Sequence, residues 1–231
     1  MTQERAAADE KKRLVGIKAA EYIESGMHVG IGSGTTVYWL IQALGKRIAR
    51  EGLSFRGVAT SRETVRLAKA SGINTVSLND VDHLDLAIDG ADEVDPQGRL
   101  IKGGGGALVR ERLVARAADR FIVIVDPSKF VEVLGRFPLP IEVIPFGWKT
   151  TAERIRGLGI NPVLRKRNQR TFVSDNGNYI LDVEFGTIPD PEALYRSLKL
   201  IAGVVDCGIF AEFQPTVLSM KAGSFEERSF G

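Results

Sequence analysis

The sequence contains little that would indicate a secreted, membrane or nucleic-acid-binding protein. It has one cysteine in 231 residues, which excludes an internal disulfide framework and fits a reducing compartment. Aromatic residues make up 7% of the chain, too few to predict stacking platforms for bases, and 31 Lys and Arg nearly balance 29 Asp and Glu. No apolar run approaches the roughly 18 to 20 residues of a membrane span, and the N-terminus has no apolar core of signal-peptide length. We therefore expect a cytoplasmic protein with neither a nucleic-acid partner nor a membrane partner.

Residues that bind transition metals are also scarce. The two histidines and the single cysteine do not have zinc-site spacing, and Cys207 lies in the apolar run VVDCGIF, which predicts a buried structural thiol. Asp89, Asp92, Glu93 and Asp95 could hold a divalent ion, but they lack the order of an EF-hand and have a lysine nearby. Direct acid–base use of these carboxylates is the preferred interpretation, with a metal site as the alternative.

Short apolar runs alternate with helical patterns along the first part of the chain. The expected strands are 27–31, 54–59, 73–78, 84–89 and 121–125, and the expected helices include 10–25, 37–50 and 61–72. This alternation predicts an α/β fold with a Rossmann-like, doubly wound, mostly parallel sheet. In such sheets ligands bind at the carboxyl ends of the strands.

The pattern changes near residue 135, where 137–140 resembles a linker. The expected order is then strand 141–144, helix 150–158, strands 164–173 and 179–184, helix 191–200 and strand 204–210. This is the split βαβ pattern of a small α+β, ferredoxin-like domain. We therefore expect a Rossmann-like catalytic domain over 1–134 and 206–231, with 216–220 returning to the first sheet. Residues 135–205 would form the small domain, a candidate oligomer contact. The basic run 165–167 in it is interpreted as a solvated strand face or an assembly contact.

A glycine-rich turn follows the first strand. Free backbone N–H groups at the start of the next helix, together with the helix dipole, favour an anion at such a turn. The hydroxyl groups would add donors and a helix cap. The turn is Gly32, Ser33, Gly34, Thr35 and Thr36. It lacks the glycine spacing of a dinucleotide site and the Gly-Lys-Ser/Thr triplet of a Walker loop. A small monophosphate is the preferred ligand, and a plain tight turn is the alternative.

Charged side chains follow three further apolar runs. Strand 84–89 opens into Asp89-Gly90-Ala91-Asp92-Glu93, and the short run 100–101 leads to Lys102 and the four glycines 103–106. Lys129 follows strand 121–125, where it is either a phosphate contact or a solvated lysine. All of these positions lie at carboxyl ends of expected strands.

Glu111 is a carboxylate on the apolar face of the helix that begins after the four glycines. Five apolar residues lie within about 60° of it on a helical wheel: Ala107, Leu108, Val114, Ala115 and Ala118. A carboxylate there loses hydration, which suits a general base. The alternative is a surface glutamate on a helix whose small residues are exposed.

These groups match the needs of proton transfer next to the carbonyl of a sugar phosphate. That reaction requires a base and a cation or donor for the developing enediolate oxygen. Glu111 and Lys102 suit those two roles. Asp89 and Asp92 suit hydrogen bonding to sugar hydroxyls and opening of a cyclic sugar.

Five motifs together resemble type A ribose-5-phosphate isomerase: VGIGSGTTV, AIDGADEVD, IKGGGGALVRE, VDPSK and FPLPIEVIPFGW. The resemblance runs in order over nearly the whole chain. It implies interconversion of ribose 5-phosphate and ribulose 5-phosphate through an enediolate, with no metal or organic cofactor, in a homodimer or homotetramer. Gln214-Pro215-Thr216 departs from the pattern, which leaves the register of the last strand open.

The resemblance also implies roles for individual residues. The catalytic residues would be Glu111, which transfers the proton, with Asp89, Asp92 and Lys102. The substrate-binding residues would be Ser33, Gly34, Thr35, Thr36, Asp89, Gly90, Ala91, Asp92, Lys102, Gly103, Gly104, Gly105 and Lys129. Lys12 resembles a further basic position, and the sequence does not decide which lysine contacts the phosphate.

Two other functions fit parts of the pattern. A sugar-phosphate sensor that regulates transcription would need a DNA-binding module, and the stretch before Leu14 is too short for a helix-turn-helix. A different sugar-phosphate enzyme, such as an amino-sugar deaminase, is disfavoured by the combination of DGADE and KGGGGAL.

Overall fold

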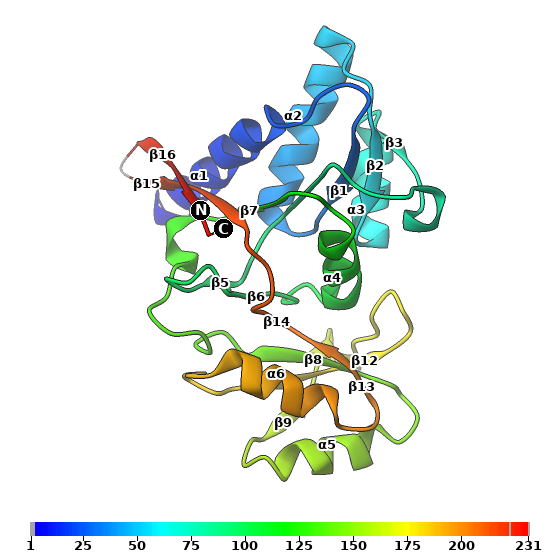
Figure 1. Cartoon of the computed structure of the whole chain (residues 1–231), viewed down its shortest axis with the longest axis vertical. Coiled ribbons are helices and arrows are strands. Elements are labelled where there is room, and N and C mark those ends of the chain that lie inside the picture. The colour runs from blue at the N-terminus through cyan, green and yellow to red at the C-terminus, as the bar shows by residue number, and fades with distance from the viewer. Residues whose placement is uncertain (1–2, 222, 231) are drawn as a thin grey trace. The chain divides into compact units, whose positions relative to one another are not determined.

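The computed structural model describes residues 3–221 and 223–230, and the chain divides into two compact units (Figure 1). The first unit comprises Met1–Gly90, Arg110–Lys129 and Gln214–Gly231. The second comprises Ala91–Val109 and Phe130–Phe213. The domain limits expected from the sequence stay a prediction. Among the described residues, no helix is long and apolar enough to cross a membrane.

The first unit contains a seven-stranded sheet in the order β16-β15-β7-β4-β1-β2-β3. All neighbouring strands are parallel except the β15–β16 pair. The strands are β1 (His28–Ile31), β2 (Arg56–Ala59), β3 (Asn74–Thr75), β4 (Leu86–Asp89), β7 (Phe121–Ile124), β15 (Thr216–Lys221) and β16 (Ser224–Ser229). The helices are α1 (Gln3–Ala20), α2 (Thr35–Glu51), α3 (Arg62–Ala70) and α4 (Leu108–Arg116), with 3-10 turns η1 (Leu78–Asp80) and η2 (Pro127–Lys129). The mostly parallel Rossmann-like sheet predicted from the sequence is confirmed.

Two ends of this sheet differ from the prediction. The expected strand 73–78 is reduced to β3, because Ser77 caps the 3-10 turn η1 through its hydroxyl instead of continuing the strand. The tail returns to the sheet as expected, and β15 pairs with β7 in the register Thr216↔Ile122. Strand β16, which covers β15 as an antiparallel edge, was not anticipated.

Alternate residues of the central strands point to opposite faces of the sheet. Val29 and Ile31 belong to a buried cluster with Leu40 of α2, so α1 and α2 cover this face. Gly30 lies between them in sequence and faces the other side. A Cβ atom on Gly30 would lie 2.3 Å from Cγ1 of Val114 in α4. Helix α4 therefore packs on the opposite face and approaches β1 closely because Gly30 has no side chain.

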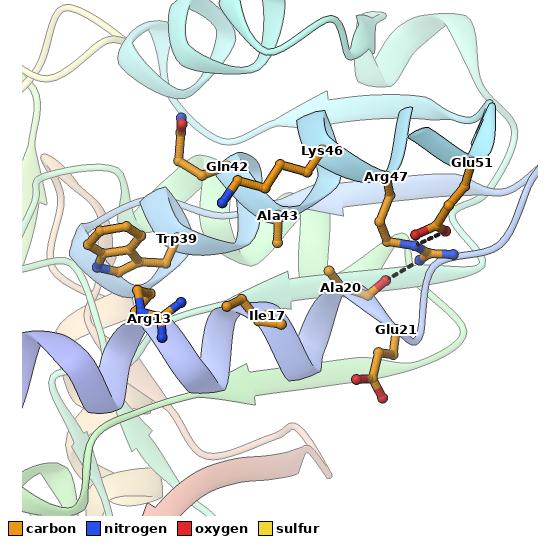
Figure 2. A pocket seen from close by; sticks show the side chains of 10 residues that line it. All are labelled: Arg13, Ile17, Ala20, Glu21, Trp39, Gln42, Ala43, Lys46, Arg47 and Glu51. Carbon is orange, nitrogen blue, oxygen red and sulfur yellow. Dashed lines mark hydrogen bonds and ion pairs between the residues drawn. The ribbon is translucent and has the colours of Figure 1, made fainter. Parts of the chain in front are cut away.

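Helices α1 and α2 lie against each other (Figure 1). Arg47 of α2 joins them: its Nη1 donates to the carbonyl oxygen of Ala20, and its Nε donates to Glu51 Oε2 at 2.8 Å (Figure 2). The same Nη1 donates to the carbonyl oxygen of Ile23 at 2.8 Å. These bonds satisfy carbonyl groups at and just beyond the end of α1, where no intrahelical donor is available.

The second unit contains a four-stranded antiparallel sheet in the order β13-β8-β12-β9. Its elements are β8 (Leu139–Val143), α5 (Trp148–Arg156), β9 (Pro162–Leu164), β12 (Tyr179–Val183), α6 (Pro191–Lys199) and β13 (Val204–Cys207). Numbered along the chain, the strand order is 4-1-3-2, which confirms the ferredoxin-like split βαβ prediction. Cys207 is buried and forms no disulfide, as expected for a structural thiol.

Two expectations in this unit are wrong in detail. Strand β8 begins at Leu139, so part of the expected linker 137–140 belongs to the sheet. The expected strand 164–173 is broken: β10 (Lys166–Arg167) and β11 (Arg170–Thr171) form a separate hairpin. The break occurs because Asn168 and Gln169 adopt positive φ angles of 51° and 62°, which turn the chain back.

A second, three-stranded sheet in this unit has the order β14-β6-β5. Its strands are β5 (Glu93–Val94), β6 (Leu100–Ile101) and β14 (Ile209–Phe210). Strand β5 forms inside the segment expected to be an open acidic loop. Its Glu93 side chain is buried and accepts hydrogen bonds from the backbone N–H groups of Gly135 at 2.7 Å and Phe137 at 2.6 Å.

The close approach of α4 to β1 yields a stability prediction. We expect Gly30→Ala to lower the free energy of unfolding by about 1–3 kcal/mol, because the new methyl group overlaps Val114 Cγ1. Urea denaturation measures the change. The double variant Gly30→Ala/Val114→Ala lacks the Val114 methyl that overlaps the new alanine. Its loss of unfolding free energy should therefore be clearly smaller than the sum of the losses in the two single variants. Strict additivity would contradict the contact.

The buried carboxylate of Glu93 yields a second stability prediction. A glutamine at this position offers one acceptor oxygen in place of two, so one backbone N–H would lose its partner. We expect Glu93→Gln to lower the free energy of unfolding by about 1–3 kcal/mol. Glu132→Gln is the matched control, because Glu132 is exposed and its replacement should have no measurable effect. Equal unfolding midpoints for the two variants would rule out this role for Glu93.

Candidate active site

The switch point of the first sheet lies between β1 and β4. Strands β2 and β3 lie on one side of β1, whereas β4 and β7 lie on the other. Open α/β sheets bind ligands at the carboxyl ends of the two strands where this reversal occurs. The turn 32–36 follows β1, and Asp89 ends β4, so both lie at this point.

Three predicted site residues contact one another at the switch point. Asp89 Oδ1 accepts hydrogen bonds from the N–H groups of Ser33 at 3.0 Å and Gly90 at 2.7 Å. The Ser33 hydroxyl donates to Glu111 Oε1 at 2.7 Å. The side chains of Asp89 and Glu111 are buried, each residue being 4% exposed. The expected burial of Glu111 is confirmed, and Ser33 is the residue that joins the two carboxylates.

Gly32 makes this arrangement possible, although sequence reasoning gave it no role of its own. A Cβ atom at this position would lie 2.0 Å from Asp89 Oδ1. The N–H of Gly32 also donates to the carbonyl oxygen of Ile88 at 2.9 Å, which ties the turn to β4. The tight fit of Gly32 against Asp89 depends on a contact between segments 57 positions apart, so the local pattern could not reveal it.

The helix after this turn begins without the expected side-chain cap. The residue at the N-cap is Gly34, with φ 94°, and no side chain caps the helix there. The hydroxyl of Ser33 is used by Glu111 instead, whereas Thr35 and Thr36 form the first turn of α2. What the turn offers an anion is therefore chiefly the backbone N–H groups at the start of α2, as expected for a phosphate site.

Lys129 follows β7 and lies at the same carboxyl edge of the sheet. It ends the 3-10 turn η2, and its N–H donates to the carbonyl oxygen of Asp126 at 3.1 Å. The carboxylate of Asp126 in turn accepts from the N–H and the hydroxyl of Ser128. This small network fixes the backbone that carries Lys129.

The second unit contains the remaining predicted residues. Lys102 is 2% exposed, and its ammonium lies 5.6 Å from the centre of the Phe210 ring, within range of a cation–π contact. The Lys102 N–H donates to the carbonyl oxygen of Gly208 at 2.9 Å. An ammonium taken out of bulk water in this way interacts strongly with any negative charge that forms near it.

Asp92 is bound to the glycine segment 103–106. Its Oδ2 accepts a hydrogen bond from the N–H of Gly104 at 2.8 Å. A Cβ atom on Gly104 would lie 2.7 Å from Asp92 Oδ1, so no larger residue fits. Gly103 and Gly106 have φ angles of 95° and 85°, a conformation that favours glycine.

Arg165 does not lie on a solvated strand face, which was one of the two alternatives given for the basic run. The basic run 165–167 was expected to be solvated or to form an assembly contact. Lys166 and Arg167 are exposed, but the Arg165 side chain is only 13% exposed. Its Nη1 donates to the carbonyl oxygens of Gly103 at 3.1 Å and Gly104 at 3.0 Å. The local sequence does not distinguish Arg165 from Lys166 and Arg167, because the glycine carbonyls that it binds lie 61 and 62 positions away.

The acidic segment divides between site and scaffold. Glu93 binds backbone N–H groups, as described above. Asp95 accepts from the N–H groups of Gln97 and Arg99 and forms an ion pair with the Arg99 side chain at 2.6 Å. Within the part of the chain that the structure describes, no group of three or more His, Cys, Asp or Glu side chains could hold a metal ion.

Each unit also contains a cavity. One of 530 Å³ between α1 and α2 is lined by residues such as Arg13, Trp39 and Lys46 and by none of the predicted site residues (Figure 2). The other, of 630 Å³, lies in the second unit. Its lining comprises Gly104, Phe137, Pro138, Asn161, Val163, Arg165, Asp182 and Glu184. The second cavity thus borders the glycine segment.

Sequence comparison identifies close relatives. The profile of the family described as Ribose 5-phosphate isomerase A (phosphoriboisomerase A) matches residues 56–223. Ribose-5-phosphate isomerase A 1 of Oceanobacillus iheyensis is 49% identical over 210 residues, covering 91% of this chain and 94% of that protein. Ribose-5-phosphate isomerase A of Bacillus mycoides is 51% identical over 200 residues, covering 86% and 90%.

Solved structures agree with these matches. Ribose 5-phosphate isomerase A of Methanocaldococcus jannaschii superposes with a TM-score of 0.90 at 37% identity, covering 95% of this chain and 98% of that one. A D-ribose-5-phosphate isomerase in complex with phospho-erythronic acid superposes with a TM-score of 0.92 at 38% identity, covering 96% and 99%. The chain therefore belongs to the ribose 5-phosphate isomerase A family.

Proposed function

We propose that this chain interconverts D-ribose 5-phosphate and D-ribulose 5-phosphate through an enediolate, with Glu111 as the proton-transferring base. Family membership supports the reaction, and a relative was solved with phospho-erythronic acid, a sugar-acid phosphate. The observation that carries the role of Glu111 is its buried carboxylate at the switch point, with one oxygen bound by the Ser33 hydroxyl.

Glu111 would act on the open-chain sugar. In the forward direction it removes the proton from C2, and the electron pair forms the C1–C2 double bond while charge develops on O1. The same carboxyl then returns the proton to C1, while the proton on O2 passes to O1, which gives the C2 ketone and the C1 hydroxyl. The hydrogen bond from Ser33 fixes one carboxylate oxygen, so the base keeps its orientation through both transfers.

Lys102 would stabilise the negative charge that develops on the enediolate oxygen. A cation that is already desolvated and fixed needs little reorganisation during the reaction, which makes it effective in the transition state. Lys102 meets this condition, because it is 2% exposed and packed beside Phe210.

Asp89 and Asp92 would bind sugar hydroxyl groups and assist opening of the cyclic form. Both carboxylates are fixed by backbone N–H donors, Asp89 by Ser33 and Gly90 and Asp92 by Gly104. Carboxylates held in this way are defined acceptors for hydroxyl protons.

The remaining predicted residues would bind the sugar phosphate through backbone groups and a lysine. We assign to this role Ser33, Gly34, Thr35, Thr36, Gly90, Ala91, Gly103, Gly104, Gly105 and Lys129. The start of α2 supports a phosphate at residues 33–36, because its N–H groups and dipole favour an anion. A location in the cytoplasm and a homodimeric or homotetrameric state stay predictions.

The role of Glu111 is tested by replacing it with glutamine. We expect Glu111→Gln to lower the rate of ribulose 5-phosphate formation by about 10²–10⁴-fold, because an amide cannot accept the C2 proton. A coupled assay measures turnover, and calorimetry with phospho-erythronic acid should show binding within a few-fold of the parent.

Glu63→Gln is the control for this experiment, since Glu63 is an exposed helical glutamate paired with Arg66. It should retain full activity. A Glu111→Gln variant that keeps most of its activity would reject this assignment of the base. A parent protein that binds the sugar phosphate without converting it would instead reject the isomerase function.

The proposed mechanism uses no metal ion. Preincubation of the enzyme with excess EDTA should therefore leave the isomerisation rate unchanged, provided that the coupling enzymes are shown separately to tolerate the chelator. Two of the four candidate metal ligands support this expectation, because Glu93 and Asp95 already bind N–H and guanidinium donors. Loss of activity that added Mg²⁺ or Mn²⁺ restores would overturn it.

A further inference from the structure

Arg165 binds two successive carbonyl groups of the glycine segment. Its Nη1 lies 3.1 Å from the carbonyl oxygen of Gly103 and 3.0 Å from that of Gly104. Glycines have no side chains to fix the direction of their peptide planes, and their backbone is unusually free. The Gly103 carbonyl oxygen also accepts from the N–H of Gly106 at 2.9 Å, so for the Gly104 carbonyl in particular the guanidinium supplies a constraint that the glycines themselves lack.

Peptide planarity carries this constraint to the neighbouring N–H groups. In a trans peptide the C=O of one residue and the N–H of the next point in opposite directions. Two carbonyls held by Arg165 therefore turn the N–H groups of Gly104 and Gly105 away from it. The N–H of Gly104 does point to another partner, Asp92 Oδ2, at 2.8 Å.

Gly105 provides the second of these donors. It is exposed, and within residues 3–221 and 223–230 its N–H has no acceptor. A directed backbone N–H that faces solvent is a donor available to an anionic oxygen.

Arg165 is itself held firmly enough to act in this way. Its Nε donates to Asp182 Oδ2 at 2.8 Å and its Nη2 donates to Asp182 Oδ1, a bidentate pair. The guanidinium also lies 5.7 Å from the centre of the Phe172 ring, and that ring fills the space where a Cβ on Gly106 would be. A planar fork that binds Asp182 with one edge and two carbonyls from Nη1 is a geometry that lysine cannot reproduce.

We propose that Arg165 is a positioning residue, which directs the N–H of Gly105 toward an anionic oxygen of the bound sugar phosphate. This inference rests on the proposed function, because it takes the glycine segment to be part of the substrate site. Arg165 acts only through the peptide groups of Gly103 and Gly104. Asp182 in turn orients Arg165.

The test compares three variants with a matched control. Arg165→Ala removes the guanidinium, Arg165→Lys keeps the charge but not the fork, and Asp182→Asn weakens the ion pair. Arg167→Ala is the control, because the Arg167 guanidinium lies 5.0 Å from the centre of the same Phe172 ring and has no hydrogen bond to the glycine segment among the described residues.

We expect Arg165→Ala to raise KM for ribose 5-phosphate and the Kd for phospho-erythronic acid by about 10- to 100-fold, with kcat changed only a few-fold. Arg165→Lys and Asp182→Asn should give smaller increases in the same constants. Arg167→Ala should match the parent. A purely structural role would instead lower the folded fraction, which reduces kcat and leaves KM unchanged.

Each outcome decides between these interpretations. An unchanged KM and Kd in folded Arg165→Ala would overturn the proposal. If that variant does not fold, unchanged constants in folded Arg165→Lys and Asp182→Asn would overturn it equally. Absence of isomerase activity in the parent would refute the proposed function and, with it, this inference. Unchanged constants in the variants of an active parent would refute only the role of Arg165.

Discussion

The hydrogen bond between the Ser33 hydroxyl and Glu111 Oε1 joins a turn to a helix 78 positions away. The arrangement of the predicted site residues in the first unit depends on this bond. It requires that α4 lie close to β1. That approach exists because Gly30 leaves room for Val114. Packing and chemistry are therefore coupled: the same absent side chain that lets the helix approach the sheet also brings the buried carboxylate to the turn. A larger residue in the sheet would affect the base without touching it.

The acidic segment after β4 shows how neighbouring carboxylates acquire different tasks. Asp89 and Asp92 bind N–H groups of Ser33 and Gly104, which belong to predicted substrate-binding segments. Glu93 instead binds N–H groups of Gly135 and Phe137 and stabilises the fold. Asp92 lies just before strand β5 and Glu93 begins it, and these adjacent carboxylates accept N–H groups from different segments of the chain. Residue type alone cannot distinguish them, because every member of the series is a carboxylate.

The sequence predicts those features that depend on local periodicity. The burial of Glu111 follows from its place in an apolar arc, and the mostly parallel first sheet and the split βαβ pattern of the second unit follow from the succession of strands and helices. Features that depend on distant contacts were missed. Arg165 belongs to a basic run with no local sign that two glycine carbonyls lie beside it. The requirement for Gly32 is likewise set by Asp89, which a window around the turn does not include.

Asp89 and Asp92 are held in place by the same kind of contact with a glycine. Each lies so close to a glycine that a Cβ would overlap its carboxylate: 2.0 Å between Gly32 and Asp89 Oδ1, and 2.7 Å between Gly104 and Asp92 Oδ1. Each also accepts an N–H from that glycine or the residue after it. In both pairs the carboxylate packs directly on the backbone and accepts a peptide N–H, which orients the carboxylate. A larger residue in place of either glycine would therefore displace the aspartate carboxylate that packs on it.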